Sequence, residues 1–318
     1  MEKINISIVI PVYNAAAFLE KAVNSALQFK EVSEILLVED ASTDNSLEIG
    51  KELASENSRI KLFRHYDEGN HGAGATRNLG IEKSTGDFIA FLDADDYYLP
   101  NRFDAEKEIF KDPKIDGVFG AIGVEYITEK GKQEFQQKFK ESNLTTVNYP
   151  AEGEEVFRGL LGLTSKTFGS FFHLNTLTVK KSALDKANLR FNVNLRVHQD
   201  SDFNLKLAYL CYLKSGIIDQ AVAMRGIHDD NRITKIKLYS SKFYKNSLLY
   251  NESVYLWSKV YALEKEYAKK IALDYFSFKI ANQKGLKKWL SFLGTALQYP
   301  ELLKTRYRFH ALNNPHDE

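Results

Sequence analysis

The chain contains little cysteine and proline and no long apolar run, and each scarcity excludes a class of protein. Because Cys211 is its single cysteine, it cannot form an internal disulfide, so we expect a reducing compartment and no disulfide-stabilised scaffold. Six prolines and 18 glycines in 318 residues exclude collagen-like and proline-rich disordered chains. No segment reaches the roughly 18 consecutive apolar residues that a membrane-spanning helix needs. The remaining class is a globular protein with its own hydrophobic core.

An excess of charge of one sign is also missing. The chain has 43 Lys and Arg against 42 Asp and Glu, a net charge of +1, so we expect no global attraction to nucleic acid and no nucleic-acid partner. The first residues, MEKINISIVIPVYN, interrupt a short apolar run with polar residues and Pro11. We therefore expect a strand there, not a signal peptide, and a cytoplasmic protein.

Short apolar runs rich in β-branched residues dominate the first third of the chain. They lie at residues 6–12, 34–40, 60–63 and 87–93, and segments with helical periodicity separate them. This alternation predicts βαβ units in an α/β fold with a Rossmann-like, mostly parallel sheet flanked by helices. We expect helices to begin after Asn14 and Asp44 as N-caps, and a third helix to run from near Gly74 to before Gly86. Ligands of such sheets bind at the carboxyl ends of the strands.

The rest of the chain carries weaker patterns. Residues 117–128 and 216–226 are predicted to be strands, and residues 198–210 (HQDSDFNLKLAYL) a helix. The polar stretch at 129–148 is expected to form a hairpin or a mobile loop, and it is a candidate for disorder together with residues 313–318. From about residue 236 the chain is helical and aromatic, which predicts a C-terminal helical extension.

Three aspartates follow the fourth apolar run, in FIAFLDADDYYLP. Asp93 and Asp95 flank Ala94 at the end of a predicted buried strand, so their side chains can point to the same side. Two carboxylates placed this way repel each other unless a cation lies between them, and Mg²⁺ or Mn²⁺ prefers oxygen ligands of this kind together with substrate phosphates. The alternative is that Asp95 or Asp96 caps a helix near Pro100. The position at the mouth of a parallel sheet favours a metal site.

Five segments in this order and spacing resemble the family 2 inverting glycosyltransferases of the bacterial surface-polysaccharide type, which have a GT-A type fold: IPVYNAAAFLEKAVNSAL, LLVEDASTDNS, GAGATRNLGI, GDFIAFLDADD and FNVNLRVHQDSDFNLKL. The resemblance implies a GT-A catalytic domain over residues 1–235, with a nucleotide-sugar half (1–128) and an acceptor half (129–235), and a helical region over 236–318. It also implies that the Asp-x-Asp motif of Asp93, Ala94 and Asp95 holds Mn²⁺ or Mg²⁺ against the diphosphate of a nucleotide sugar.

The resemblance assigns the nucleotide to loops that follow the first three strands. It implies that Pro11, Val12 and Tyr13 form the first nucleotide-contacting loop, although packing at the sheet edge is an equal explanation for the Tyr13 ring. It makes Asp40 the acceptor of a hydrogen bond from the base, usually uracil, whereas Asp40 taken by itself could be a turn residue. The family commonly has Asp-Asp-Gly here, and this chain has Glu-Asp-Ala.

Arg77 matches the arginine that the family places near the nucleotide diphosphate. The alternative is an arginine on the surface of a helix. The GxG spacing of Gly72 and Gly74 is weak support for a dinucleotide site, because Arg77 stands where the third glycine would be and no strand immediately precedes the loop.

Inverting sugar transfer needs a general base for the acceptor hydroxyl, and a metal or cations for the departing diphosphate. The resemblance assigns the base to Asp200, next to Gln199 where the family usually has Glu. Asp202 is the alternative base, and either aspartate could instead cap its helix. The segment MRGIHDDNRIT resembles an Arg-x-x-His segment of the family, which makes His228 a candidate metal ligand, with Arg225 or Arg232 near phosphate.

The expected donor is a nucleotide sugar with a UDP moiety, and the expected acceptor is an oligosaccharide or a lipid-linked molecule in cell-surface polysaccharide biosynthesis. Residues 284–310 combine Trp289, leucines and basic residues at helical spacing. Such a segment could lie on the inner face of a membrane, or it could belong to a helical subdomain packed on the catalytic domain or on a partner. A homodimer is compatible with the sequence.

Two other functions fit parts of the pattern. A sugar-1-phosphate nucleotidyltransferase also has acids at the end of an α/β sheet, but it should carry a glycine-rich loop with Arg and Lys after the first strand, and PVYNAAAF has neither. A non-catalytic nucleotide-sugar-binding or scaffold protein is the third hypothesis, because Gln199 replaces an acidic residue. A turnover assay separates it from the enzyme.

Overall fold

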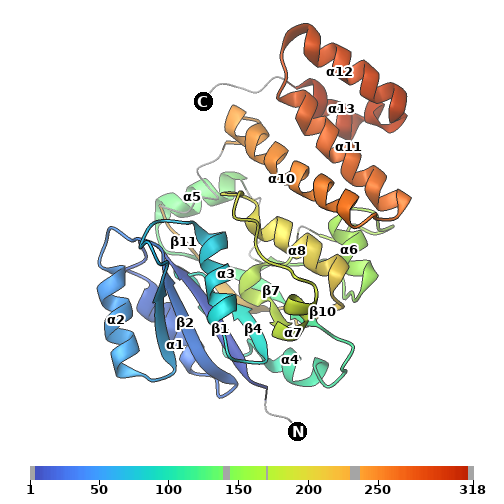
Figure 1. Ribbon diagram of the computed structural model, residues 1–318. Helices are drawn as coiled ribbons and strands as arrows, with labels where there is room; N and C mark the ends of the chain where they lie inside the picture. Colours follow the sequence, from blue (N-terminus) through green and yellow to red (C-terminus); the bar gives the residue numbers. More distant parts are fainter. Residues whose placement is uncertain (1–3, 139–143, 170, 230–236, 314–318) are drawn as a thin grey trace. The chain divides into compact units, whose positions relative to one another are not determined.

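The computed structural model describes residues 4–138, 144–169, 171–229 and 237–313 (Figure 1). The chain forms two compact units, which we describe separately. The first unit consists of Met1–Arg196 and Phe203–Asp230, and the second unit of Val197–Asp202 and Asn231–Glu318. The predicted boundary after residue 235 lies outside the described residues.

A seven-stranded sheet forms the centre of the first unit. Its strand order is β10-β6-β9-β4-β1-β2-β3. Only β9 runs antiparallel to its neighbours among these described strands, so the sheet is mostly parallel. The strands are β1 (Ile6–Val12), β2 (Val32–Glu39), β3 (Ile60–Arg64), β4 (Phe88–Phe91), β6 (Gly117–Phe119), β9 (Thr178–Lys180) and β10 (Leu213–Ser215).

Helices cover both faces of this sheet (Figure 1). The side chains of Ile6, Ile8 and Ile10 alternate along β1 and join one core with α1 (Leu19–Leu27) and α2 (Ser46–Glu56). On the other face, α3 (Ala73–Lys83) lies so close to β1 that a Cβ at Gly80 would be 2.3 Å from a methyl group of Val9. The expected α/β fold with a flanked, mostly parallel sheet is therefore confirmed.

A second, four-stranded sheet lies beside the first in the same unit. Its order is β5-β11-β7-β8, with β11 parallel to β7 and antiparallel to β5. These strands are β5 (Tyr97–Tyr98), β7 (Ala121–Tyr126), β8 (Leu144–Thr145) and β11 (Ala221–Ile227), and the remaining helices of the unit are α4 (Asp104–Ile109), α5 (Glu129–Lys138), α6 (Glu154–Leu160), η1 (Leu174–Thr176), α7 (Lys181–Lys186) and most of α8 (Gln199–Leu210). The pairing of β11 with β5 brings the last strand of the unit to the segment that follows the aspartates.

Three local predictions were wrong. Asn14 does not cap a helix: its side chain accepts a hydrogen bond from the backbone N–H of Thr43 (2.8 Å), and α1 begins only at Leu19. Residues 117–128 are not one strand, because the chain divides at Gly120 into β6 and β7, which belong to different sheets. The polar stretch from 129 forms the helix α5 and not a hairpin, while residues 139–143 lie outside the described part.

The second unit is helical, as expected from the sequence after residue 236. It contains α10 (Ser241–Val260), α11 (Lys265–Ala281), α12 (Gly285–Gln298), η2 (Pro300–Leu303) and α13 (Thr305–Leu312). Its core includes Leu273, Ile280, Phe292, Leu302 and Ala311. Among the residues that the structure describes, no helix is long and apolar enough to cross a membrane.

Candidate functional site

The loop between β4 and β5 carries the three aspartates at the carboxyl end of a central strand. The backbone N–H of Asp96 donates to the carbonyl of Asp93 (3.0 Å), which folds the segment into a tight turn. The helix α4 begins only at Asp104, after Phe103, so neither Asp95 nor Asp96 caps it. The capping alternative is therefore wrong, and the three carboxylates have other partners.

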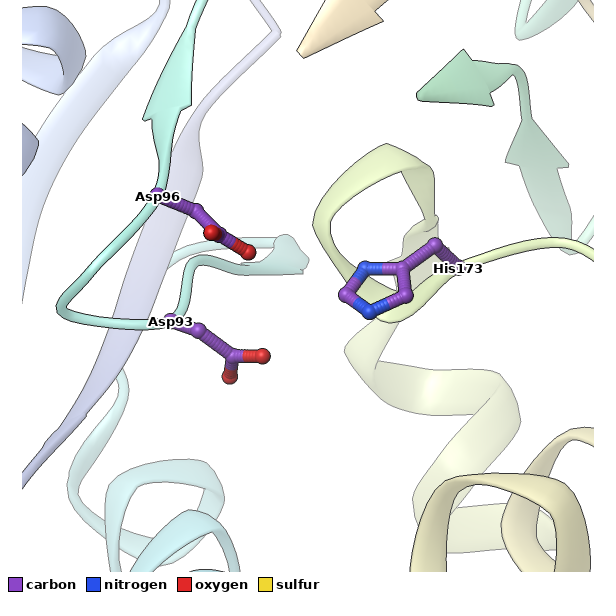
Figure 2. A group of neighbouring side chains, drawn as sticks. All are labelled: Asp93, Asp96 and His173. Carbon is purple, nitrogen blue, oxygen red and sulfur yellow. The ribbon is translucent and has the colours of Figure 1, made fainter. Parts of the chain in front are cut away.

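Asp93, Asp96 and His173 form a group that could hold a divalent cation (Figure 2). One potential ligand atom from each residue lies within 4.8 Å of the other two. Asp93 and Asp96 come from the β4–β5 loop and His173 from the segment before η1, and Figure 2 shows both carboxylates directed toward the imidazole. Asp96 and His173 are buried, whereas the Asp93 side chain is partly exposed.

The charges of this group are unbalanced without a cation. Burial, and then the charges of Asp95 and Asp93, raise the pKa of Asp96 well above its usual range. Burial alone would also raise the pKa of Asp93, but the charge of Arg77, the hydrogen bond that Arg77 donates and the other nearby cationic groups together lower that pKa. Burial, and then the charge of Arg225, lower the pKa of His173 to about 3, so its imidazole is neutral at physiological pH.

Asn175 connects the members of this group. Its side-chain oxygen accepts from the backbone N–H of Asp93 (3.0 Å), and its side-chain N–H₂ donates to Asp96. Its backbone N–H donates to Nδ1 of His173 (3.3 Å), so a neutral ring in this position carries its proton on Nε2. Asn175 is fully buried, and the geometry of the group depends on it.

Asp95 meets His228 beside this group. The Nε2 atom of His228 lies 3.1 Å from a carboxylate oxygen of Asp95, and its ring packs on Phe18 with centroids 4.7 Å apart. Gly226 brings β11 to this loop: its N–H donates to Asp96 (2.9 Å), and a Cβ there would lie 2.5 Å from the carbonyl oxygen of Asp95. The structure thus brings His228 to the Asp-x-Asp motif, and its role as a metal ligand stays a prediction.

Arg77 reaches the same loop from α3. Its Nη2 donates to a carboxylate oxygen of Asp93 (2.5 Å), and its guanidinium lies over the ring of Phe191. Arg77 is only 7% exposed, so the alternative of a helix-surface arginine is wrong. Its Nε is buried and has no hydrogen-bond partner among the described residues, which leaves a donor for an anion.

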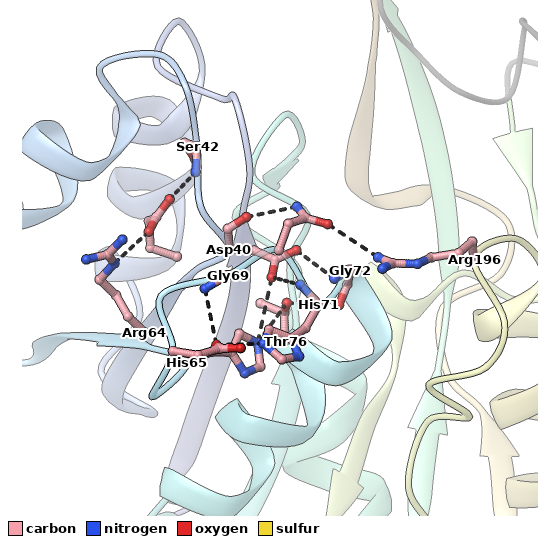
Figure 3. Close-up of polar contacts among 12 residues, drawn as sticks. Asp40, Ser42, Arg64, His65, Gly69, His71, Gly72, Thr76 and Arg196 are labelled. Carbon is pink, nitrogen blue, oxygen red and sulfur yellow. Dashed lines mark hydrogen bonds and ion pairs between the residues drawn. The ribbon is translucent and has the colours of Figure 1, made fainter.

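Asp40 directly follows β2 and has partners different from those of Asp93 (Figure 3). Its two carboxylate oxygens accept the backbone N–H groups of His71 (2.7 Å) and Gly72 (2.8 Å), and its carbonyl accepts from Asn70. Gly72 has φ +82°, a backbone conformation that favours glycine, and a Cβ there would also force the guanidinium of Arg196, 2.1 Å away, to move. Asp40 is buried and braces the 70–72 loop, and its role in binding a base stays a prediction.

The first predicted nucleotide loop follows β1. Pro11 is a strand residue and the Val12 side chain belongs to the core, whereas Tyr13 is 46% exposed. The backbone N–H of Asp40 donates to the carbonyl of Val12 (2.9 Å). The half-exposed Tyr13 therefore directly follows β1, at the point where the backbones of β1 and Asp40 are hydrogen-bonded.

Asp200 and Asp202 belong to the second unit and lie in the first turn of α8. Asp202 is fully buried and accepts a hydrogen bond from the Ser253 hydroxyl (2.7 Å). Asp200 is half-buried, and its neighbour Gln199 is buried. Burial excludes Asp202 from contact with an acceptor, so Asp200 stays the predicted base.

Sequence reasoning missed Asp96, His173 and Asn175 as members of the site. The sequence suggests for Asp96 only the role of a helix cap. His173 and Asn175 lie about 80 residues after the aspartates. The one available signal was the pair of polar residues inside the apolar segment FFHLNTLTV. No spacing rule connects that segment to the aspartates.

Comparisons with known proteins agree on one family. A family model described as "Glycosyl transferase family 2" matches residues 7–169. An uncharacterized glycosyltransferase of Haemophilus influenzae is 40% identical over 102 residues, which are 32% of this chain and 40% of that protein. The cholesterol galactosyltransferase of Borreliella burgdorferi is 29% identical over 198 residues, 60% of this chain and 52% of that protein. The matched segments thus span about half or less of these two relatives.

Solved structures show the same fold over nearly the whole chain. The crystal structure of residues 1–349 of S. aureus TarS in complex with UDP-GlcNAc has a TM-score of 0.60 and 17% identity, and the match covers 96% of this chain and 83% of that chain. At this identity the likeness concerns the fold. It agrees with the predicted GT-A type architecture and its C-terminal helices.

Proposed function

Because the chain belongs to glycosyl transferase family 2, we propose that it transfers a sugar from a nucleotide diphosphate donor to an acceptor hydroxyl, with inversion at the anomeric carbon. The observation that carries the proposal is that Asp93, Asp95, His173 and His228 lie together at the carboxyl end of β4, with Arg77 against Asp93. Acidic and imidazole ligands beside a buried guanidinium suit a cation and a diphosphate together.

Asp95 and His228 are the residues that we propose to hold Mg²⁺ or Mn²⁺, with Asp93 completing the protein ligands. The 3.1 Å between His228 Nε2 and Asp95 matches the separation of roughly 3 Å expected between neighbouring ligands about 2.1 Å from one octahedral ion. Asp96 is assigned a structural role in the loop, because its carboxylate oxygens already accept hydrogen bonds from Gly226 and Asn175. When bound, the ion would neutralise charge on the diphosphate as it leaves.

Arg77 and His173 are proposed to bind the diphosphate directly. The Nε of Arg77 is a buried donor without a partner among the described residues, and His173 presents an Nε2–H in its neutral form. Both groups donate hydrogen bonds in a site that excludes much of the water, where hydrogen bonds to phosphate oxygens are strong. The pKa of His173, lowered to about 3 mainly by burial, keeps this donor neutral throughout the physiological range.

A UDP-sugar is the proposed donor. The support is that the TarS structure of the same fold contains UDP-GlcNAc, and that the half-exposed Tyr13 follows Val12, whose carbonyl accepts the backbone N–H of Asp40. Asp200 is proposed to accept the proton of the acceptor hydroxyl. The proposed acceptor is an oligosaccharide or a lipid-linked molecule, in cell-surface polysaccharide biosynthesis.

The test is a binding and turnover experiment on the full chain. We expect UDP and UDP-GlcNAc to raise the melting temperature only when Mn²⁺ or Mg²⁺ is present, because a ligand that binds only the folded state stabilises it. Asp95→Asn should abolish this metal-dependent shift, and Asp87→Asn should keep it, since Asp87 is exposed at the opposite end of β4. A shift that persists in EDTA would contradict the metal site.

Turnover separates an enzyme from a binding protein. With a competent acceptor, Asp200→Asn should keep donor binding and release no UDP. If the parent protein binds UDP-sugars but transfers nothing to any lipid or oligosaccharide acceptor, the non-catalytic binding protein becomes the better explanation. If no nucleotide sugar binds under any metal condition, the proposed donor site is wrong.

A further inference from the structure

An apolar stripe runs along the exposed side of α12. It consists of five large side chains, each at least 54% exposed: Leu286, Trp289, Leu290, Leu293 and Leu297. Successive turns of the helix contribute Leu286, the adjacent pair Trp289 and Leu290, Leu293 and Leu297, so the five side chains lie on one side, over a length of about 17 Å at 1.5 Å per residue. Single exposed leucines are common, but a continuous stripe of this kind on one helix marks an interaction surface.

The stripe is not needed to fold the second unit. The opposite side of α12 carries the buried residues Lys288 and Phe292, and Phe292 joins the core with residues of α11, η2 and α13. The Nζ of Lys288 donates to the backbone carbonyl of Asn313 (2.6 Å), which ties this side of the helix to the end of α13. Substitutions in the stripe should therefore leave the unit folded.

The segment that contains the stripe is basic. Residues 284–313 contain a single acidic residue, Glu301, which is paired with Lys269. They contain six basic residues, all exposed except Lys288: Lys284, Lys287, Lys288, Lys304, Arg306 and Arg308. Lys287 lies three residues before Leu290, so it borders the stripe on the helix surface.

We propose that this basic, leucine-rich face of α12 docks on the surface of a bilayer that contains anionic lipids. A helix with one apolar side and cationic flanks lies in the plane of the interface, with the apolar side chains in the acyl boundary and the lysines at the headgroups. A second copy of the chain fits less well, because self-pairing would bring the lysines of both copies together. The proposal does not depend on the proposed activity.

Vesicle co-sedimentation of the full chain tests the proposal. We expect binding to phosphatidylcholine vesicles that contain phosphatidylglycerol, and about tenfold or more weaker binding to vesicles of phosphatidylcholine alone. Leu293→Glu should weaken binding to the anionic vesicles by about tenfold or more, because it removes an apolar side chain from the acyl boundary and adds a negative charge. Val260→Glu is the matched control, since Val260 is an exposed apolar residue (81%) on α10, outside the stripe, and this variant should bind as the parent does.

Other outcomes would overturn the proposal. Equal binding of the parent and Leu293→Glu would exclude the stripe as the contact. Absence of vesicle binding, combined with a dimer in solution that Leu293→Glu converts to a monomer, would assign the face to a second copy. Absence of both vesicle binding and self-association would leave the face to a protein partner. Circular dichroism of each variant checks that the fold is retained.

Discussion

The loops after β2 and β4 both carry an aspartate close to the end of a strand, but the two aspartates have different partners. Both loops follow strands that pair with β1 in the same sheet, and each has an aspartate near its start, Asp40 or Asp93. Asp40 gives its two carboxylate oxygens to the backbone N–H groups of His71 and Gly72. Asp93 instead faces Asp96, His173 and Arg77. Both aspartates lie just beyond the carboxyl end of a strand beside β1, so their partners decide the role.

The difference lies in how each negative charge is compensated. Around Asp40, oriented backbone N–H groups stabilise the carboxylate and close the loop, as a nest of amides does for an anion. Asp96 lies beside Asp93, and its pKa is raised first by burial and then by the charges of Asp95 and Asp93. Only the loop after β4 therefore has a surplus of negative charge that a bound cation would relieve.

The largest expected effect is that of Asp93→Asn on turnover. Loss of this carboxylate should reduce transfer by roughly 10²- to 10³-fold, because it removes a proposed ligand and the partner of Arg77. The free energy of unfolding should change by no more than about 1 kcal/mol, since the attraction of Arg77 and the repulsion of Asp96 disappear together. Steady-state kinetics and urea denaturation measure the two effects, with Asp87→Asn as control. Near-parental turnover would show that the loop after β4 does not have the proposed role in cation binding that distinguishes it from the loop after β2.

Asp40→Asn should act in the opposite way, mainly on stability. The new amide N–H₂ would face a backbone N–H of the 70–72 loop and leave it buried without an acceptor, which costs about 1–3 kcal/mol. Urea denaturation should show this loss, and Asp87→Asn should not. If Asp40→Asn unfolds at the same urea concentration as the parent but no longer binds UDP, then Asp40 is a ligand of the base and not a brace.

The smallest expected effect concerns the residue after Asp40. Ala41 has φ +60°, in the left-handed region, where the related family commonly has glycine. Ala41→Gly should raise the free energy of unfolding by about 1 kcal/mol, because glycine adopts this conformation without steric cost. Ala54→Gly, in the last turn of α2, is the opposite control and should lower it by roughly 0.5 kcal/mol. A destabilised Ala41→Gly variant would show that the methyl group packs usefully.

The sequence predicted the strands of the first unit well and some helix starts poorly. The apolar runs at 6–12 and 60–63 became β1 and β3, because alternation of buried side chains is a local property of the chain. Asn14 was misplaced because its side chain binds the distant Thr43. The helix α5 was missed because nine of its ten residues are polar or glycine, which leaves Phe135 as its one large apolar residue, and that side chain is buried.

The sequence predicted only those parts of the candidate site that lie in short local motifs. Asp93, Asp95, Arg77 and His228 lie in short motifs, and the structure places Arg77 against Asp93 and His228 against Asp95. The sequence offered no comparable motif for His173 and Asn175. They reach the aspartates because β9, which follows them, pairs antiparallel with β4.

The sequence by itself determined the α/β class, the order of the strands along the chain and the presence of acids at their carboxyl ends. These features depend on residues a few positions apart, whose periodicity and charge are visible in the printed chain. The tertiary structure alone decided which acids face one another, that Asp40 is enclosed by backbone amides, and that the leucines of α12 stay exposed. Those outcomes depend on strand pairing and helix packing between residues far apart in sequence, which no local pattern encodes.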